Sequence, residues 1–284
     1  MRDRDWITRR VVVLLGLATL ALPLVAKGFG PDPFGRIVGG PRLPRVAPAA
    51  DSCGYCSDPA DGMFGVEFKG NELWVLQIAG TLYRLSNCLR LETISIQGFR
   101  GAASGLAYDP VRDLFVVTDA ELDQVCQVQL QGPAEAVVVN TWPSPSTGPV
   151  GAAYDSRRDL YWITDFESGM IQSINPKTGL PGPAFVAPAG SHIAGTAYDA
   201  THDVILYNGR FQGETYMISA ATGALLDSLA IPGADINSED LGLAPDGTLW
   251  IHQTGLRRVV CVDRSTPVVH RTWGQLKASY RSRR

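Results

Sequence analysis

The sequence lacks an excess of positive charge and the motifs of the common enzyme classes. Its formal net charge is −3, with 25 Lys and Arg residues against 28 Asp and Glu residues. A nucleic-acid-binding domain needs a basic surface, so this balance argues against that class. No phosphate-binding loop, HExxH helix, GxGxxG turn or nucleophile elbow occurs in the chain. The sequence therefore offers no constellation from which catalytic residues can be predicted.

Long hydrophobic runs are also scarce, apart from one near the N-terminus. Residues 11–26 are apolar and follow the basic pair Arg9 and Arg10. This length is typical of the hydrophobic region of a signal peptide and is short for a membrane span. We predict that residues 1–26 direct export to the periplasm, to the extracellular space or to a membrane-anchored state. The sequence leaves open whether this segment is cleaved or stays as an anchor.

The segments around the central part of the chain differ from it in composition. Residues 27–50 are rich in Pro and Gly, which cannot maintain a hydrogen-bonded ladder, so we predict an extended linker there. Residues 51–273 carry a repeated strand-like pattern, and residues 274–284 form a basic C-terminal tail.

Cysteine is scarce, and its odd count limits the disulfide pattern. The five cysteines are Cys53, Cys56, Cys88, Cys126 and Cys261. Export permits disulfides, and an odd count leaves at least one thiol unpaired. We predict a structural disulfide that joins either Cys53 or Cys56 to Cys88. Cys126 lies on the apolar side of an alternating segment, and we expect a small buried side chain there.

What the sequence does contain is one pattern written five times. A Gly-Ala-Tyr-Asp-like run precedes a short polar turn, and an aromatic and aliphatic run follows. The copies begin at Gly65, Gly105, Gly151, Gly195 and Gly242, about 40 to 47 residues apart. Self-similarity at this period in strand-like units is typical of a β-propeller, so we predict an all-β fold of four-stranded blades.

Each copy divides into four short strand-like runs that are separated by turn residues. Small residues open each copy and suit a crowded innermost strand, and an aromatic second strand follows. Five blades are favoured, at residues 63–98, 103–142, 149–188, 193–231 and 240–273. A six-bladed ring with one degenerate unit is the alternative. A ring closes when an N-terminal strand completes the last blade, and residues 36–50 are the candidate despite their prolines.

The second strands carry a family resemblance. Residues 160–165, Leu-Tyr-Trp-Ile-Thr-Asp, resemble the YWTD motif with Ile163 inserted, and residues 114–119 are a weaker copy. At blade level the chain resembles the YWTD, NHL and gluconolactonase-like propellers, and this resemblance implies the fold. In gluconolactonase-like enzymes an axial divalent metal has an Asn ligand just before an inner-strand Gly. The matching positions here hold Phe64, Ser104, Val150, Ala194 and Leu241.

The loops between blades, and those between second and third strands, form the face at which propellers usually bind ligands. Acidic residues outnumber basic residues in these loops, whereas the turns at the opposite end hold several Lys and Arg residues. This distribution predicts an acidic face that attracts a cation or a basic partner. The alternative is that the acids cap turns by accepting hydrogen bonds from backbone N–H groups.

Candidate binding residues are densest just before the fifth inner strand. They are Asp235, Asn237, Glu239 and Asp240, with His192, Asp119 and Asp165 in neighbouring loops. Their oxygens are of the kind that Ca²⁺ and Mg²⁺ prefer, although the cofactor itself is unknown. Streptogramin-lyase-like enzymes place a catalytic His beside a metal-binding Glu, and the resemblance offers His192 and Glu239 for these roles.

Two hypotheses of function follow. The first is an exported, non-enzymatic propeller that binds a protein or small-molecule partner, cationic in character, through the acidic loop face. The second is a metal-dependent enzyme of the gluconolactonase or streptogramin-lyase type. The absence of a catalytic constellation favours the first hypothesis.

Overall fold

The computed structural model describes residues 52–190, 192–231 and 237–262, and among them regular structure consists of β-strands and the 3₁₀ turn η2 (Thr254–Leu256). The chain divides into Met1–Val46 and Ala47–Arg284, and every described residue lies in the second part. The expectations for residues 1–26, 27–50 and 274–284 therefore fall outside the described residues. None of the described residues belongs to a helix long and apolar enough to cross a membrane. The prediction of an all-β fold is confirmed.

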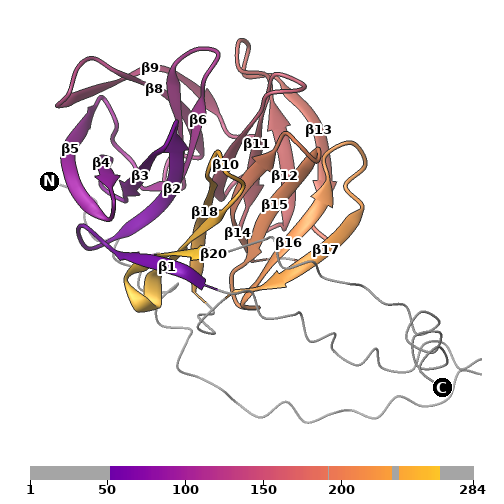
Figure 1. Ribbon diagram of the computed structural model, residues 1–284. Helices are drawn as coiled ribbons and strands as arrows, with labels where there is room; N and C mark the ends of the chain where they lie inside the picture. Colours follow the sequence, from indigo (N-terminus) through magenta and orange to yellow (C-terminus); the bar gives the residue numbers. More distant parts are fainter. Residues whose placement is uncertain (1–51, 191, 232–236, 263–284) are drawn as a thin grey trace, which may run out of the picture. The chain divides into compact units, whose positions relative to one another are not determined.

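The strands form four-stranded antiparallel units (Figure 1). The first unit contains β2 (Met63–Lys69), β3 (Glu72–Gln77), β4 (Thr81–Ser86) and β5 (Leu89–Gln97). The second contains β6 (Ala103–Asp109), β7 (Leu114–Asp119), β8 (Gln124–Leu130) and β9 (Glu135–Pro143). The third contains β10 (Pro149–Asp155), β11 (Leu160–Asp165), β12 (Met170–Ile174) and β13 (Pro181–Val186). The fourth contains β14 (Ile193–Asp199), β15 (Val204–Gly209), β16 (Glu214–Ser219) and β17 (Leu225–Ala230). The last contains β18 (Ser238–Leu243), β19 (Leu249–Gln253), β20 (Arg258–Val262) and β1 (Ser52–Ser57).

The inner strands of these units meet around a common axis. Strand β2 contacts β6, β6 contacts β10, β10 contacts β14, β14 contacts β18, and β18 contacts β2 (Figure 1). A short parallel pairing of β5 with β9 additionally joins the first two units into one eight-stranded sheet. Antiparallel four-stranded units packed side by side are the blades of a β-propeller, as the repeats predict.

The closing strand differs from the expectation. The last unit takes its outer strand from β1, which pairs with β20 from Ser52 to Ser57. The sequence pattern instead favoured residues 36–50, which lie outside the described residues, as the closing strand. The segment Ser-Cys-Gly-Tyr-Cys-Ser contains no Pro, so every residue has a backbone N–H that a ladder can use.

The alignment of the last repeat also needs correction. In the third unit Pro149 pairs with Asp165 and Gly151 with Thr164, across a bulge. In the last unit Ser238 pairs with Gln253 and Leu241 with Ile251, across a bulge at the same place. Asp240, and not Gly242, therefore occupies the position of the repeat glycines. The predicted alignment of the last repeat was wrong by two residues, because residues 242–244 have the same Gly-small-Ala sequence that opens the other repeats.

The repeated Tyr-Asp and Arg-Asp pairs form ion-pair latches at the end of the units opposite the binding loops. Asp155 Oδ1 accepts hydrogen bonds from the backbone N–H groups of Arg157 and Arg158, which closes the turn. The Arg158 guanidinium then pairs with Asp155 (2.8 Å) and with Asp203 of the next unit (2.7 Å). Equivalent latches are Arg112 with Asp109 and Asp159, and Lys69 with Asp113. The polar part of the repeat thus holds neighbouring units together.

Apolar side chains fill the space between units. Trp74 and Trp162, from equivalent second strands, are buried, and the Trp162 ring stacks on Phe185 at a centroid distance of 5.4 Å. Such burial of large aromatic rings supplies much of the stability of a sheet-on-sheet interface.

Two disulfides join the described cysteines. The predicted disulfide is Cys56–Cys88, and a second one, Cys53–Cys261, was not anticipated. Cys126 is free and buried, as expected. The sequence missed Cys261 because 208 residues separate it from Cys53, and the two meet where β1 pairs with β20. Two disulfides indicate an oxidising, exported environment.

Candidate functional site

We call the loops that join unit to unit, and those between second and third strands, the mouth. Two predicted acids, Asp119 and Asp165, lie here at the ends of β7 and β11 and close turns. Asp119 Oδ1 accepts hydrogen bonds from the N–H groups of Ala102 (3.0 Å), Glu121 (3.0 Å) and Leu122 (3.1 Å). Asp165 Oδ1 accepts two hydrogen bonds from Ser168, both at 2.6 Å. Each acid uses one oxygen for turn capping, and Asp165 Oδ2 is buried without a partner among the described residues.

Glu239 and His192 lie in one aromatic cluster at the mouth. Arg210 Nη2 is 2.5 Å from Glu239 Oε1, and both side chains are largely buried. The Arg210 guanidinium lies over the rings of Phe166 and Phe211, at 5.2 and 5.7 Å from their centroids. His192 is exposed and packs edge-on against Phe166 at 5.0 Å. The structure therefore places two predicted residues around one buried cation.

Asp240 is fully buried, and its carboxyl group contacts three other units. Its Oδ2 accepts hydrogen bonds from the backbone N–H groups of Val66 (3.0 Å) and Leu106 (3.1 Å), in β2 and β6. A Cβ added at Gly195 in β14 would lie 2.0 Å from Asp240 Oδ1. This oxygen is buried and has no hydrogen-bond partner among the described residues. The carboxyl thus fills the axis where the other units have only glycine, and desolvation raises its pKa well above the usual range.

Glu67 is a second axial acid, which the sequence analysis did not single out. The registers place it where the other inner strands have Ala or Gly. Its carboxylate accepts hydrogen bonds from the N–H groups of Phe68 (2.6 Å) and Tyr108 (3.2 Å). The Glu67 side chain as a whole is half-buried, but its carboxyl group is surrounded by packed strands. Burial of the carboxyl group raises the pKa of Glu67 to about 8. A comparison of the repeats position by position would have revealed it, because a carboxylate replaces a small residue.

A buried His–Asp pair lies beside Asp240. His252, in β19, is fully buried, and its Nε2 is 3.1 Å from Oδ2 of Asp58, which follows β1. Asp58 Oδ1 and His252 Nδ1 are also buried and have no partner among the described residues. The pair unites residues that are 194 positions apart, so no local sequence signal indicates it.

The remaining predicted residues contribute less. The backbone carbonyl of Asn237 accepts a hydrogen bond from Thr254 N–H at 3.1 Å. Asp235 lies outside the described residues. Within the part of the chain that the structure describes, no three His, Cys, Asp or Glu side chains are grouped so that they could hold a metal ion. Ca²⁺ or Mg²⁺ therefore remains a prediction without a ligand set.

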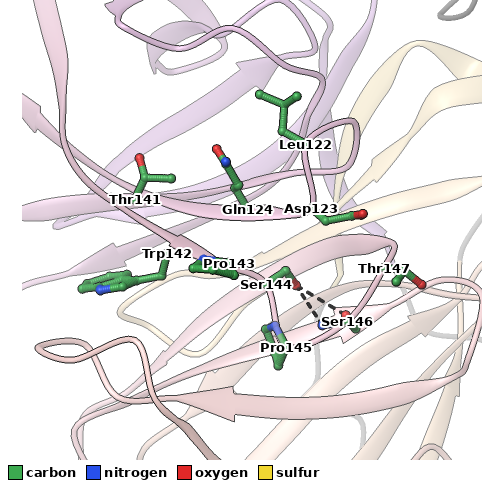
Figure 2. A pocket seen from close by; sticks show the side chains of 10 residues that line it. All are labelled: Leu122, Asp123, Gln124, Thr141, Trp142, Pro143, Ser144, Pro145, Ser146 and Thr147. Atoms are coloured by element: carbon green, nitrogen blue, oxygen red, sulfur yellow. Dashed lines mark hydrogen bonds between the residues drawn. The ribbon is translucent and has the colours of Figure 1, made fainter.

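A surface groove of about 500 Å³ lies among the mouth loops of the second unit (Figure 2). It is formed by the β7–β8 turn, the β8–β9 pair and the loop that leads to β10, and it includes Leu122, Gln124, Thr141 and Trp142. None of the residues predicted from the sequence lines it. Trp142 is directed partly into the interface with the third unit, where its indole leaves no room for a Cβ at Gly179.

The comparisons with known proteins identify the fold. No protein-family model and no curated protein matches the chain. A glutaminyl cyclase from Myxococcus xanthus has a similar structure, with a TM-score of 0.63 and 15% identity over 76% of this chain and 96% of the cyclase. An inactive virginiamycin B lyase from Staphylococcus aureus gives 0.49 and 14%, covering 74% of this chain and 69% of the lyase. The WD40 β-propeller domain of Doa1 gives 0.49 and 10%, covering 71% and 63%. At such identities the similarity shows the fold alone, and the described strands form a β-propeller.

Proposed function

We propose that this protein is an exported β-propeller of five blades that binds a cationic group of a partner at its mouth. Five blades are supported by the cycle of inner-strand contacts, which returns from β18 to β2 after five units. Export is supported by the two disulfides and by the signal-like composition of residues 1–26.

One observation carries the binding proposal. Two carboxylate oxygens on the mouth side, Asp58 Oδ1 and Asp165 Oδ2, are buried and lack a hydrogen-bond partner among the described residues. A buried acceptor without a donor is costly, and a ligand that brings N–H donors removes this cost. An ammonium or guanidinium group supplies such donors together with a compensating charge.

The aromatic cluster supports the same chemistry. Phe166 and Phe211 already hold the Arg210 guanidinium against their faces, with Glu239 as its counter-charge. Phe211 is 47% exposed, and Glu167 is exposed in the adjoining loop. Aromatic faces and carboxylates are the two groups that bind organic cations in proteins.

The alternative of a metal-dependent hydrolase or lyase has less support. It requires a set of metal ligands, and the described residues provide none. The similarity to the cyclase and the lyase concerns the fold, and a propeller fold does not determine an activity.

Calorimetric titration of the purified protein with spermidine and with arginine methyl ester tests the proposal. We expect saturable binding of these cations, weakened roughly threefold to tenfold by Glu167→Gln because the rim loses one negative charge. Glu135→Gln removes the same charge from exposed β9, at the end remote from the mouth, and should leave the affinity unchanged. Absence of cation binding, or equal effects of the two variants, would refute the mouth as the site.

A further inference from the structure

The two disulfides have different positions relative to the closure of the ring. Cys53–Cys261 joins β1 to β20, two strands that a backbone ladder already pairs. Cys56–Cys88 joins β1, in the last unit, to the turn between β4 and β5, in the first unit. Of the covalent cross-links between described residues, it is the one that crosses the seam between the last and the first unit.

Among the described residues, this seam has no ion-pair latch of the kind that joins the first four units to one another. Between the third and fourth units the Arg158 guanidinium contacts two carboxylates and is only 28% exposed. Across the seam the ion pair is Arg257 with Asp61, whose side chains are 65% and 82% exposed. Exposed ion pairs contribute little to stability, so the seam depends more on its disulfide and its apolar contacts.

The Cys88 side of this disulfide is accessible and has an unfavourable backbone conformation. Cys88 is exposed, and it forms a two-residue turn with Asn87 in which both residues have positive φ, 62° and 49°. Such turns favour Gly at the second position because a side chain is strained there. Reaction of an external thiolate at an exposed sulfur is the usual start of disulfide exchange.

We propose that Cys56–Cys88 is a thiol-exchange site, a clasp whose opening by an external dithiol loosens the seam and exposes the Asp58–His252 pair. The dithiol's thiolate attacks Cys88 Sγ, the bond between the two protein sulfurs breaks, and Cys56 leaves as a thiolate that takes up a proton. The second thiol of the dithiol then attacks the mixed disulfide and releases Cys88. The protein gains two electrons and two protons, and the dithiol becomes a cyclic or intramolecular disulfide.

The position of Cys56 links this chemistry to the mouth. Cys56 is buried in an apolar cluster that includes Met63 and Val66 of the first unit and Val259 of the last. Asp58 follows two residues later and holds His252, and both side chains are at most 5% exposed in the closed ring. Release of Cys56 removes the covalent restraint nearest to this pair. The regulatory meaning of the clasp rests on the proposed cation binding, whereas its exchange chemistry does not.

Native-state alkylation tests the clasp, with buried Cys126 as an internal reporter of global unfolding. The oxidised protein is incubated with increasing dithiothreitol, treated with iodoacetamide and mapped by peptide mass spectrometry. We expect Cys56 and Cys88 to be labelled at a roughly tenfold lower dithiothreitol concentration than Cys126, Cys53 and Cys261. Labelling of Cys126 together with Cys56, or earlier opening of Cys53–Cys261, would overturn the proposal.

Two matched variants separate the clasp from general stability. Cys56→Ser/Cys88→Ser should increase amide hydrogen exchange in β1 and around His252 by roughly tenfold or more, while exchange in β11 stays unchanged. Cys53→Ser/Cys261→Ser lowers global stability, so it should raise exchange around His252 no more than in β11, because Cys56–Cys88 still crosses the seam. Equal exchange in both variants would contradict a clasp at Cys56–Cys88. Titration of the same variants with spermidine reports separately on the mouth.

Discussion

At the scale of single residues, two acids interrupt the small side chains that line the axis. Asp240 replaces a repeat glycine, and Glu67 replaces the alanine two positions further along. Space for them comes from small residues on neighbouring strands, since a Cβ at Gly195 would overlap Asp240 and a Cβ at Gly242 would lie 3.0 Å from Glu67 Cα. Asp240 accepts hydrogen bonds from two backbone N–H groups, those of Val66 and Leu106. These groups lie on inner strands, which have no further strand to pair with on the axis side.

Replacement of Glu67 by Gln should change how stability depends on pH. The folded protein holds the pKa of Glu67 at about 8, against 4.5 for an unperturbed Glu. The folded state therefore binds the proton more tightly, and this stabilisation is complete below pH 4.5 and is lost as the pH rises to about 8. Urea unfolding between pH 5 and 9 should show a shallower decline for Glu67→Gln than for the parent protein. Glu135→Gln, at an exposed position, serves as the control, and an unchanged slope in Glu67→Gln would disprove the assignment.

At the scale of elements, the turn between the inner and second strands determines how neighbouring units meet. Asp155 is fully buried and is neutralised by Arg158, which also reaches Asp203 in the next unit. The hydrogen bonds from Arg158 hold the pKa of Asp203 at about 2. One arginine thus satisfies a capping carboxylate of its own unit and a carboxylate of its neighbour. This explains why Asp and Arg recur at fixed spacing in the repeats.

Removal of this arginine should therefore destabilise the protein more than removal of its neighbour in sequence. Arg158→Ala leaves Asp155 buried without its guanidinium, and we expect a loss of about 2 kcal/mol in the free energy of unfolding. Arg157 is 48% exposed and lies 4.0 Å from Asp203, so Arg157→Ala should cost less than about 0.5 kcal/mol. Chemical denaturation of both variants measures the difference, and equal losses would show that the latch has no special role.

At the scale of the whole molecule, β1 converts an open row of units into a closed ring. Without β1 the outer edge of β20 would present unpaired backbone groups, and the last unit would contain three strands. Cys53–Cys261 fixes this arrangement by linking positions 208 residues apart. A cross-link that closes so long a loop restricts the unfolded chain strongly.

Loss of this cross-link should lower global stability. For Cys53→Ser/Cys261→Ser we expect the free energy of unfolding to fall by about 4 kcal/mol, because the unfolded chain regains the entropy of the long loop. Denaturant unfolding of the variant and of the parent protein, both under oxidising conditions, provides the measurement. A change below about 1 kcal/mol would mean that the β1–β20 ladder alone closes the ring.

Sequence periodicity alone was sufficient to predict the propeller. A strand exposes alternate faces, and only a repeated unit that buries both faces against its neighbours produces an aromatic second strand and a small-residue inner strand in every copy. The unit boundaries follow from Gly, Pro and Asp at the turns, since these residues fix the local backbone conformation. Asp119 and Asp165 show where such local reasoning stops. Turn capping explains the Oδ1 atom of each residue, but it does not explain the surroundings of Oδ2.

What the sequence could not determine are contacts between residues distant along the chain. The partners of Cys53 and Asp58, Cys261 and His252, come from the other end of the propeller. The role of Asp240 depends on Val66, Leu106 and Gly195, which belong to three different units. These contacts form only when the ring closes, because closure brings the first and last units together. Closure also determines the space at the axis, which cannot be deduced from a single repeat. Local preference thus determined the blades, and tertiary packing alone determined what their inner ends enclose.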